Sequence, residues 1–369
     1  MAGLMVVLDG MQDIEYDVLG GLSPYDSGKG DAFRKFEEEA ATGLLTTTPE
    51  GFEPDTQTCV LTLLGVEPKD IPDGRSYVEA LALGLPVGFD DLIMRCNFVK
   101  VADNGTLEVP CCAAPEKIAS ALREEVLGQK GHSIFPVGSY KSLQLIKDAR
   151  PHIEGLKTFM PHQHQGERFE DLLPTGNELA DKLANFSREM LKKYKPYTVL
   201  NWAQAIKGEL PAFPALHHGL NAGMVSKTDA PVGAAVAMWM ETPKLPTATG
   251  DTDTDLPAKL EATLKLVEEV SFTMLHIGGP DEATHRQNPK EKADFIRKLD
   301  SEIIAPIMER VPKGTRVMIT CDHEALCSTA GHTANPVKFW LWEKGTVLMG
   351  DMGTLPGTKA VSLLVNEDD

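Results

Sequence analysis

The sequence has few cysteines for its length, no long apolar run and no excess of positive charge. Its six cysteines form no Cys-x-x-Cys pair with zinc-site spacing and are too sparse for a disulfide scaffold, so reduced thiols are expected. No run approaches the eighteen or so apolar residues of a membrane-spanning helix. A formal net charge of −18 disfavours nucleic acid and anionic membranes as partners. Any anionic substrate therefore needs local positive charge.

What is present fits a large globular chain. With 369 residues, of which 42% are hydrophobic, the sequence is long enough for an extensive core and for two domains. The opening "MAGLMVVLDG" has no basic segment before its apolar stretch and no small-residue cleavage site, so a cytoplasmic location is expected. The four tryptophans are too scattered to predict a platform on which bases could stack.

Three short apolar runs each lead to an acidic residue. "LMVVL" ends at Asp9, "FTMLHI" ends shortly before Asp281, and "RVMITC" ends at Asp322 and His323. Continuous apolar runs of this length are typical of parallel strands that are buried on both faces. Because ligands bind beyond the carboxyl ends of such strands, we expect these acids to lie at one edge of a sheet.

Residues 288–311 separate the second and third runs and predict an amphipathic crossover helix. The order is thus strand, Asp-x-x-x-His, helix, strand, Asp-His. Asp281 and His285 allow two interpretations at this point: a pair of ligands at the sheet edge, or an ordinary ion pair in the first turn of a helix.

The middle of the chain alternates helical and strand-like patterns of its own. We interpret residues 101–221 as an inserted domain, and residues 1–100 together with 222–369 as the core domain. A loop rich in threonine, glycine and aspartate leads back into the core.

Mixed carboxylate and imidazole ligands favour manganese or zinc over magnesium or calcium. The candidates for such ligands are Asp9, Asp281, His285, Asp322, His323 and His332. A set of this size suggests two divalent ions, one of which would activate a hydroxyl group. Thr56 and Thr58 precede an apolar stretch and could supply that hydroxyl, although either could simply cap a helix.

Six stretches together carry a family resemblance: "LDGMQD", "LLGVEPKDIPDGRSYVEALALGLPVGFDDLIMRCNFV", "PHQHQG", "TATGDTDTD", "GPDEATHRQNPKEK" and "CDHEALCSTAGHTANPV". In this order they resemble the cofactor-independent phosphoglycerate mutases, in particular their archaeal-type branch within the alkaline phosphatase superfamily. The resemblance implies an α/β fold with an alkaline-phosphatase-like core, in which helices flank a mostly parallel sheet, and an inserted smaller α/β domain that handles the substrate.

The resemblance also implies roles for individual residues. Asp281, His285 and His332 would hold one metal ion; Asp9, Asp322 and His323 would hold the other together with the nucleophile. Thr56 stands where the family has its reactive serine, and Lys141 stands where the family has an arginine. The remaining matches are His162 as a proton carrier and Arg75 and Arg95 as substrate-binding residues, with Lys141 in the same role. Lys227 has no such match; it lies near the expected return to the core domain and is a weak candidate for phosphate binding.

The predicted function is metal-dependent phosphoryl transfer that interconverts 2-phosphoglycerate and 3-phosphoglycerate through a phosphothreonine. The alternative is a metal-dependent phosphatase or phosphotransferase acting on another small hydroxylated metabolite, because the first half-reaction is shared. A metal-binding module without catalysis is a third possibility. The expected partner is a small anionic phosphorylated metabolite, with neither nucleic acid nor membrane.

Overall fold

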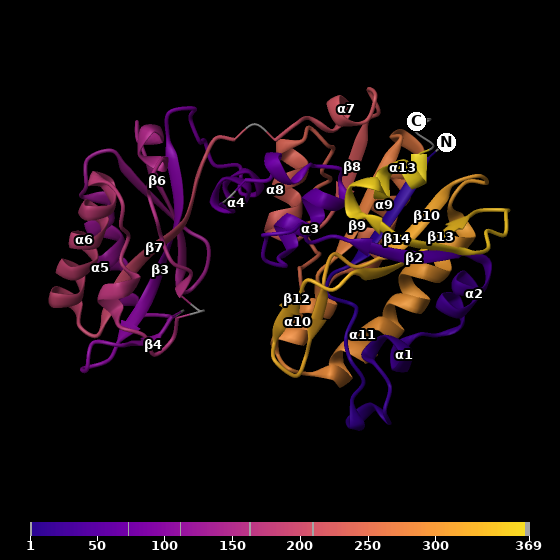
Figure 1. Cartoon of the computed structure of the whole chain (residues 1–369), viewed down its shortest axis with the longest axis horizontal. Helices are drawn as coiled ribbons and strands as arrows, with labels where there is room; N and C mark the ends of the chain where they lie inside the picture. Colours follow the sequence, from indigo (N-terminus) through magenta and orange to yellow (C-terminus); the bar gives the residue numbers. More distant parts are fainter. Residues whose placement is uncertain (1, 73, 111, 162–163, 209, 366–369) are drawn as a thin grey trace. The chain divides into compact units, whose positions relative to one another are not determined.

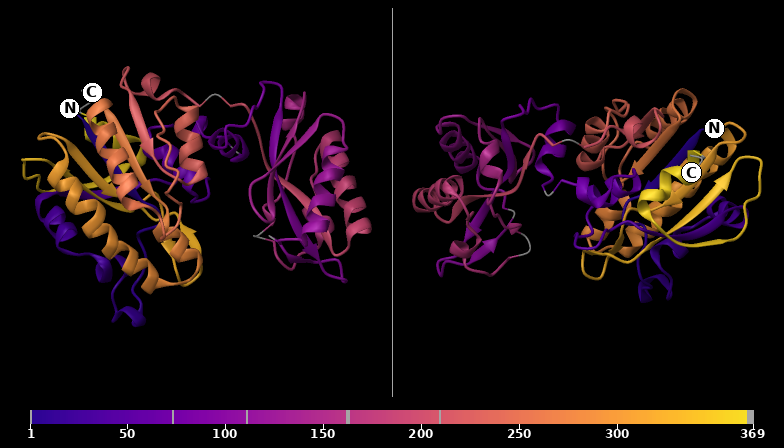
Figure 2. Two further views of the ribbon diagram at one scale, coloured as in Figure 1. Left: turned by 180° about the vertical axis from the view of Figure 1, so that it is seen from behind. Right: turned by 45° about the horizontal axis from the view of Figure 1, so that its top comes forward.

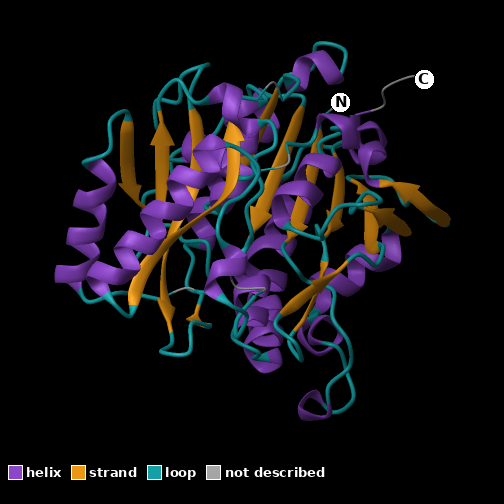
Figure 3. Cartoon of the chain, turned by 60° about the vertical axis from the view of Figure 1, so that its left-hand side comes forward, coloured by secondary structure: helices purple, strands orange, loops and turns teal. Residues whose placement is uncertain are grey.

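The computed structural model describes residues 2–72, 74–110, 112–161, 164–208 and 210–365. The chain forms two compact units: Met1–Ile71 with Leu210–Asp369, the core unit, and Pro72–Glu209, the inserted unit (Figure 1). Both units combine strands with helices (Figure 3).

The boundaries of the inserted unit differ from those predicted. The predicted boundary at residue 100 falls within strand β3 (Leu92–Val101), which pairs with other strands of the inserted unit along its length. An apolar run that is buried on both faces does not reveal the sheet to which it belongs. The second boundary, predicted at residue 221, lies earlier in the chain. Helix α7 (Phe213–Leu216) belongs to the core unit, where its Phe213 stacks on Phe272.

The core unit is built on a seven-stranded sheet. In spatial order its strands are β14 (Asp351–Pro356), β2 (Ala41–Thr46), β13 (Val337–Glu343), β10 (Arg316–Thr320), β1 (Gly3–Leu8), β9 (Phe272–Ile277) and β8 (Ala222–Val225). β13 is antiparallel to both its neighbours, and the other adjacent pairs are parallel. The prediction of a mostly parallel α/β core is thus confirmed.

Helices cover the sheet of the core unit (Figure 2). They are α1 (Pro24–Gly28), α2 (Asp31–Glu39), α3 (Thr56–Leu63), α8 (Asp229–Ala237), α9 (Leu256–Glu269), α10 (Gly279–His285), α11 (Pro289–Leu299), α12 (Ala305–Arg310) and α13 (Ala360–Val365). The predicted crossover helix is α11, which continues through a π-helical turn at Asp300–Ile304 into α12. Asn288 caps α11, and its apolar face is buried as expected.

The strands β10, β1 and β9 bring three acids to one edge of the sheet. Every residue of β1 and β9 is buried, as predicted for strands covered on both faces. Asp9 follows β1 directly, Asp322 follows β10, and Asp281 lies in the first turn of α10 after β9. A short hairpin of β11 (Glu324–Leu326) and β12 (Gly331–Thr333) brings His332 back toward this edge.

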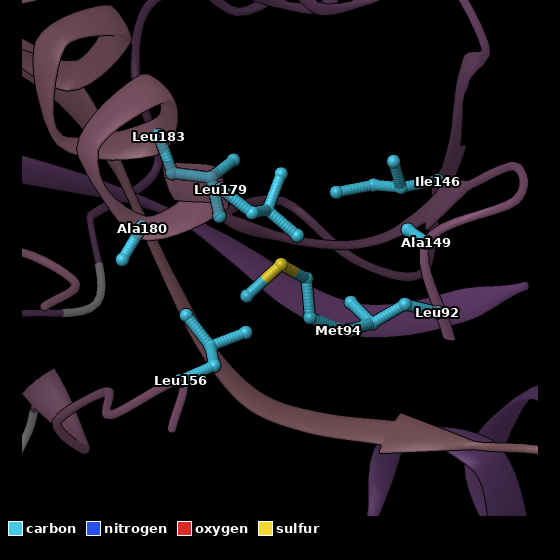
Figure 4. Close-up of a cluster of buried hydrophobic side chains, with 8 residues drawn as sticks. All are labelled: Leu92, Met94, Ile146, Ala149, Leu156, Leu179, Ala180 and Leu183. Carbon is cyan, nitrogen blue, oxygen red and sulfur yellow. The ribbon is translucent and has the colours of Figure 1, made fainter. Parts of the chain in front are cut away.

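The inserted unit contains an antiparallel sheet whose two faces differ. Its strands are β3, β4 (Leu107–Val109), β5 (His132–Pro136), β6 (Lys141–Ile146) and β7 (Tyr197–Ile206). On one face, Leu92 and Met94 belong to an apolar cluster with α6 (Glu178–Tyr194), shown in Figure 4. Helix α5 (Glu116–Leu127) packs on the same face. Helix α4 (Ser76–Ala82) covers the other face, where Ile93 packs against it. Arg95 lies two residues further along β3 and therefore on the same face as Ile93.

Among the described residues, no helix has the length and apolar character needed to span a membrane.

Candidate metal centre

Three carboxylates are buried together at the edge of the core sheet. Asp9, Asp281 and Asp322 are 2%, 7% and 0% exposed. Burial, and then the charges of Asp322 and Asp281, raise the pKa of Asp9 well above its usual value. Three acids so close together repel one another when ionised, and their burial removes the water that would screen them. A cation bound among these carboxylates would therefore stabilise the cluster.

Two histidines contact Asp281. The Nε2 atom of His285 lies 3.0 Å from one carboxylate oxygen, and Nε2 of His332 lies 3.1 Å from the other. Burial by itself raises the pKa of Asp281, but the hydrogen bonds from these histidines outweigh it and hold that pKa well below its usual range.

The orientation of His332 is informative. Its Nδ1 lies 2.9 Å from the carbonyl oxygen of Pro54, which can only accept a hydrogen bond, so Nδ1 carries a proton. Donation from Nε2 to Asp281 as well makes the ring a cation: burial lowers the pKa of His332, but the hydrogen bond to Asp281 outweighs it and raises that pKa. A bound metal ion would take the place of the proton on Nε2. A histidine whose other nitrogen donates to a carbonyl is the usual arrangement of a metal ligand.

His323 and Thr56 complete the predicted set. Nε2 of His323 lies 3.3 Å from Asp322 and 3.5 Å from Asp9, and burial lowers the pKa of this ring. The hydroxyl oxygen of Thr56 lies 3.5 Å from the same Nε2 atom. The structure therefore brings all seven predicted metal-site residues into one cluster: Asp9, Thr56, Asp281, His285, Asp322, His323 and His332.

Two overlapping groups of ligand atoms can be distinguished within this cluster. Two groups have ligand atoms within 4.8 Å of one another: Asp281 with His323 and His332, and Asp9 with His276 and Asp322. His323 adjoins both groups, because its Nε2 atom also lies 3.3 Å from Asp322 and 3.5 Å from Asp9, and its assignment to the ion of Asp9 stays a prediction. His276 was missed by the sequence analysis, although a histidine inside the apolar run "FTMLHI" was the available signal. Burial lowers the pKa of His276 to about 4, so its imidazole is neutral near pH 7.

The donor set fits divalent metal ions. Buried polar atoms of the cluster lack a hydrogen-bond partner among the described residues, namely Oδ1 of Asp9, Oδ2 of Asp322, Nε2 of His276 and Nδ1 of His323. Leaving such atoms unsatisfied is costly, and a bound cation would satisfy the carboxylates and lone pairs together. Mixed imidazole and carboxylate ligands suit zinc or manganese.

The two candidate threonines both lie in the first turn of helix α3, but their hydroxyl groups make different contacts. Asp55 caps this helix by accepting hydrogen bonds from the backbone N–H groups of Gln57 and Thr58, and its other oxygen accepts the hydroxyl proton of Thr58. The hydroxyl of Thr58 is therefore already hydrogen-bonded to Asp55, and Thr58 is buried. Thr56, in the first turn, directs its hydroxyl toward His323 instead. The helix N-terminus also favours negative charge near Thr56.

The predicted basic residues fall in both units. Arg75, Arg95 and Lys141 gather around Glu79 in the inserted unit, at 3.3 Å for Arg75 and 3.9 Å for Lys141, while Arg95 makes two hydrogen bonds to it. Hydrogen bonds and the charge of Arg95 overcome burial and lower the pKa of Glu79 to about 2. One carboxylate among three cations leaves net positive charge. Arg95 is only 7% exposed and stacks on Trp202, so Arg75 and Lys141 are the more accessible cations.

Lys227 lies in the core unit and is exposed, two residues after β8 ends. Because β8 and β9 are parallel neighbours, Lys227 follows the end of a strand at the same edge of the sheet as Asp281. His162 lies outside the described residues.

A buried lysine nearby gives a test of the electrostatics. Lys259 on α9 is fully buried, and its Nζ atom has no hydrogen-bond partner within the described parts of the chain. Burial, and then the charge of Lys227, lower its pKa from 10.5 to about 8. The unfolded chain therefore binds more protons between these two pH values, and this lysine makes stability rise with pH across that window.

We expect Lys259→Met to stabilise the protein at pH 7 by about 3 kcal/mol, as an upper bound, because the folded state no longer holds a buried ammonium. The gain should shrink as the pH rises from 8 toward 10. Urea melts of the variant and the parent at several pH values measure this difference. Lys265→Met on the exposed side of α9 is the control and should show no such pH dependence. A gain that is constant with pH would contradict a lowered pKa for Lys259.

Comparisons with known proteins agree with the resemblance carried by the motifs and with the fold. Residues 38–198 match the family model of 2,3-bisphosphoglycerate-independent phosphoglycerate mutase. The protein of that name from Methanothrix thermoacetophila is 26% identical over 99% of this chain and 100% of its own length, and a probable mutase from Geobacter sulfurreducens is 27% identical over 94% and 92%.

Solved structures support the same fold. A Pyrococcus horikoshii protein superposes with a TM-score of 0.74 at 21% identity, covering 99% of this chain and 96% of its own. The cofactor-independent phosphoglycerate mutase of Thermoplasma acidophilum gives 0.60 at 17% identity and covers 99% of both chains. The resemblance predicted from the motifs is confirmed: the chain is an enzyme and a relative of the 2,3-bisphosphoglycerate-independent phosphoglycerate mutases.

Proposed function

We propose that this enzyme interconverts 2-phosphoglycerate and 3-phosphoglycerate by metal-dependent phosphoryl transfer through Thr56. The observation that carries the proposal is the convergence of a helix-terminal hydroxyl with the buried carboxylates and imidazoles of the metal centre, 3.5 Å from Thr56 Oγ1 to His323 Nε2. The names of relatives that align over nearly the whole chain support phosphoglycerate as the substrate.

In the proposed reaction, Thr56 attacks the phosphorus atom of the substrate and loses its hydroxyl proton. The bond between phosphorus and the substrate oxygen breaks, and that oxygen gains a proton, so no net proton is consumed. The glycerate then accepts the phosphoryl group on its other hydroxyl, which regenerates Thr56. Two divalent ions, manganese or zinc, would screen the charge of the transferring group and favour the ionised hydroxyl. Asp9, Asp281, His285, Asp322, His323 and His332 would hold them.

Basic residues would bind the substrate's anionic groups. Arg75 and Lys141, supported by Arg95, form a net positive cluster in the inserted unit, and Lys227 adds a cation in the core unit. Residue His162 would carry a proton. The expected partner is thus a small anionic phosphorylated metabolite, in keeping with a cytoplasmic enzyme of glycolysis.

One departure favours a second candidate. Lys141 replaces the arginine of the family motif, and an ammonium cannot grip a carboxylate or phosphate with two parallel hydrogen bonds. A looser grip on glycerate would favour a phosphatase or a phosphotransferase with another small hydroxylated acceptor.

Product analysis separates the two candidates. The purified chain is incubated with 3-phosphoglycerate and Mn²⁺, and the products are followed by phosphorus NMR. We expect 2-phosphoglycerate. Release of inorganic phosphate alone would support the phosphatase, and an unchanged substrate would exclude phosphoglycerate as the substrate.

Glu79 provides a test of the basic cluster. Replacing it by glutamine removes the buried charge that holds Arg75, Arg95 and Lys141 together, so we expect at least a tenfold rise in KM for 3-phosphoglycerate with a smaller change in kcat. Breaking a buried ion pair should also lower the free energy of unfolding by about 3 kcal/mol. Steady-state kinetics and urea melts measure both effects. Glu178→Gln, which breaks an exposed pair with Lys182, should change neither, and an unchanged KM in Glu79→Gln would refute the assignment.

A further inference from the structure

A cavity of about 910 Å³ lies within the core unit, apart from the metal centre. Its walls come from the segment after β1 (residues 11–15), from α1 and α2, and from the strands β2 and β13. None of the seven predicted metal-site residues lines it. Sites for small organic molecules have volumes of about 300 to 1,000 Å³. The cavity is therefore large enough for such a ligand.

One part of the wall is aromatic and apolar. The rings of Tyr25 and Trp340 are stacked, with their centroids 5.2 Å apart and their planes at 28°. Met11 and Ile14 extend this surface, and Ile14 is 47% exposed although it is a large apolar residue. The ammonium group of Lys338 lies 4.9 Å from the centre of the Trp340 ring. Because an aromatic ring attracts cations through its face, this wall suits a flat apolar body that carries positive charge.

The charged part of the wall is acidic. It contains more carboxylates than ammonium groups, namely Asp13, Glu15, Asp26 and Glu37 against Lys29 and Lys338. Behind the wall, the buried Lys292 pairs with Asp13 at 2.9 Å, which leaves one carboxylate in excess. The lining therefore repels an anionic ligand and attracts a cationic one.

Most hydrogen-bond donors of the wall are already in use. The hydroxyl of Tyr25 donates to Glu37 at 2.8 Å, and the hydroxyl of Ser23 donates to Asp26 at 2.9 Å. The ammonium group of Lys29 lies 3.0 Å from Asp26 and 3.3 Å from Glu37. A carboxylate can accept about four hydrogen bonds and donates none when ionised. A ligand that satisfies this wall must therefore supply N–H donors of its own.

We propose that this cavity binds a small aromatic amine in its protonated form, with its ring against Tyr25 and Trp340 and its ammonium group among the carboxylates. This site is independent of the proposed function, because no predicted metal ligand or substrate-binding residue lines it. Its wall nevertheless adjoins the metal centre. The side chain of Gln12 donates to Glu324 at 3.3 Å, and its carbonyl accepts the N–H of Ala325 at 3.0 Å. A bound amine would thus contact the segment that holds the hairpin of β11 and β12.

The test compares two probes that share an indole ring and differ in charge, tryptamine as the cation and indole-3-acetate as the anion. Binding to the full-length chain is followed by saturation-transfer NMR in the presence of a chelator, so the result does not depend on metal or on phosphoryl transfer. Tryptamine should bind with a dissociation constant of about 1 mM or lower. Indole-3-acetate should bind at least about tenfold more weakly.

Two surface variants locate the site. Lys338→Gln removes the cation that competes for the Trp340 ring, so tryptamine should bind about two- to fivefold more tightly. Glu15→Gln removes an exposed carboxylate, so tryptamine should bind about two- to fivefold more weakly. Lys35→Gln is the matched control, because Lys35 is exposed on α2 and does not line the cavity. It should bind like the parent.

Three results would overturn the proposal. They are no binding of tryptamine by the folded parent up to about 10 mM, equal or tighter binding of indole-3-acetate, and an affinity for tryptamine that Lys338→Gln lowers or leaves unchanged. If a variant does not fold, the comparison of the two probes on the parent decides the matter. Failure of the proposed mutase activity would leave this site unaffected, since the chelator already removes the metal.

Discussion

Thr56→Ala should lower the rate of phosphoryl transfer by several orders of magnitude and abolish any covalent phospho-enzyme, because it deletes the hydroxyl that faces the metal centre. Thr56→Ser should keep measurable activity, since it retains the hydroxyl and removes only a methyl group. Steady-state kinetics with 3-phosphoglycerate and Mn²⁺ measure both changes.

Thr58 is the matched control for this experiment. It lies two residues further along α3, and its hydroxyl is hydrogen-bonded to Asp55. Thr58→Ala should cost about 1 kcal/mol of stability through the weakened cap but leave the rate within about tenfold of the parent. Loss of activity in Thr58→Ala with full activity in Thr56→Ala would exchange their roles. Full activity in both would mean that water attacks the phosphoryl group directly.

Removal of metal should be the second large effect. Chelation should abolish phosphoryl transfer, because the buried carboxylates then repel the substrate phosphate instead of sharing a cation with it. Adding Mn²⁺ or Zn²⁺ should restore the activity and raise the melting temperature. At a free metal concentration about 100 times the Kd, each ion contributes about 2.7 kcal/mol to the free energy of unfolding.

The double variant Asp281→Asn with His332→Gln isolates the metal effect. It removes ligands of one group while the core strands stay intact, so part of the metal-dependent rise in melting temperature should disappear. Full activity of the parent in excess chelator would rule out the metal-dependent mechanism.

The sheet edge could be predicted from the sequence because parallel strands are apolar throughout and end where the first acid appears. Asp9, Asp281 and Asp322 follow three such runs, and the strands are neighbours in the observed sheet. Thr56 could be placed because the resemblance sets it where the family has its reactive serine. The distinction between Thr56 and Thr58 from their contacts needed the structure, because it depends on which side chain the cap residue Asp55 engages.

Other features could not be read from the pattern. β3 is apolar on one face and carries Arg95 beneath α4 on the other, so the run resembles a core strand until its pairing partners are known. His276 was hidden for a related reason. A single histidine inside a buried strand is compatible with packing, and only the distances from its ring to Asp9 and Ser226 show that it adjoins the acid cluster.

In the proposed mechanism, Thr56 carries the phosphoryl group during turnover. The most direct measurement is rapid quenching of the enzyme with 3-phosphoglycerate and Mn²⁺, followed by proteolysis and mass spectrometry of the peptide that contains Thr56 and Thr58. We expect a single phosphate on Thr56, which is lost in Thr56→Ala and retained in Thr58→Ala. Turnover in which that peptide stays unmodified at every quench time, or carries phosphate on Thr58, would contradict it.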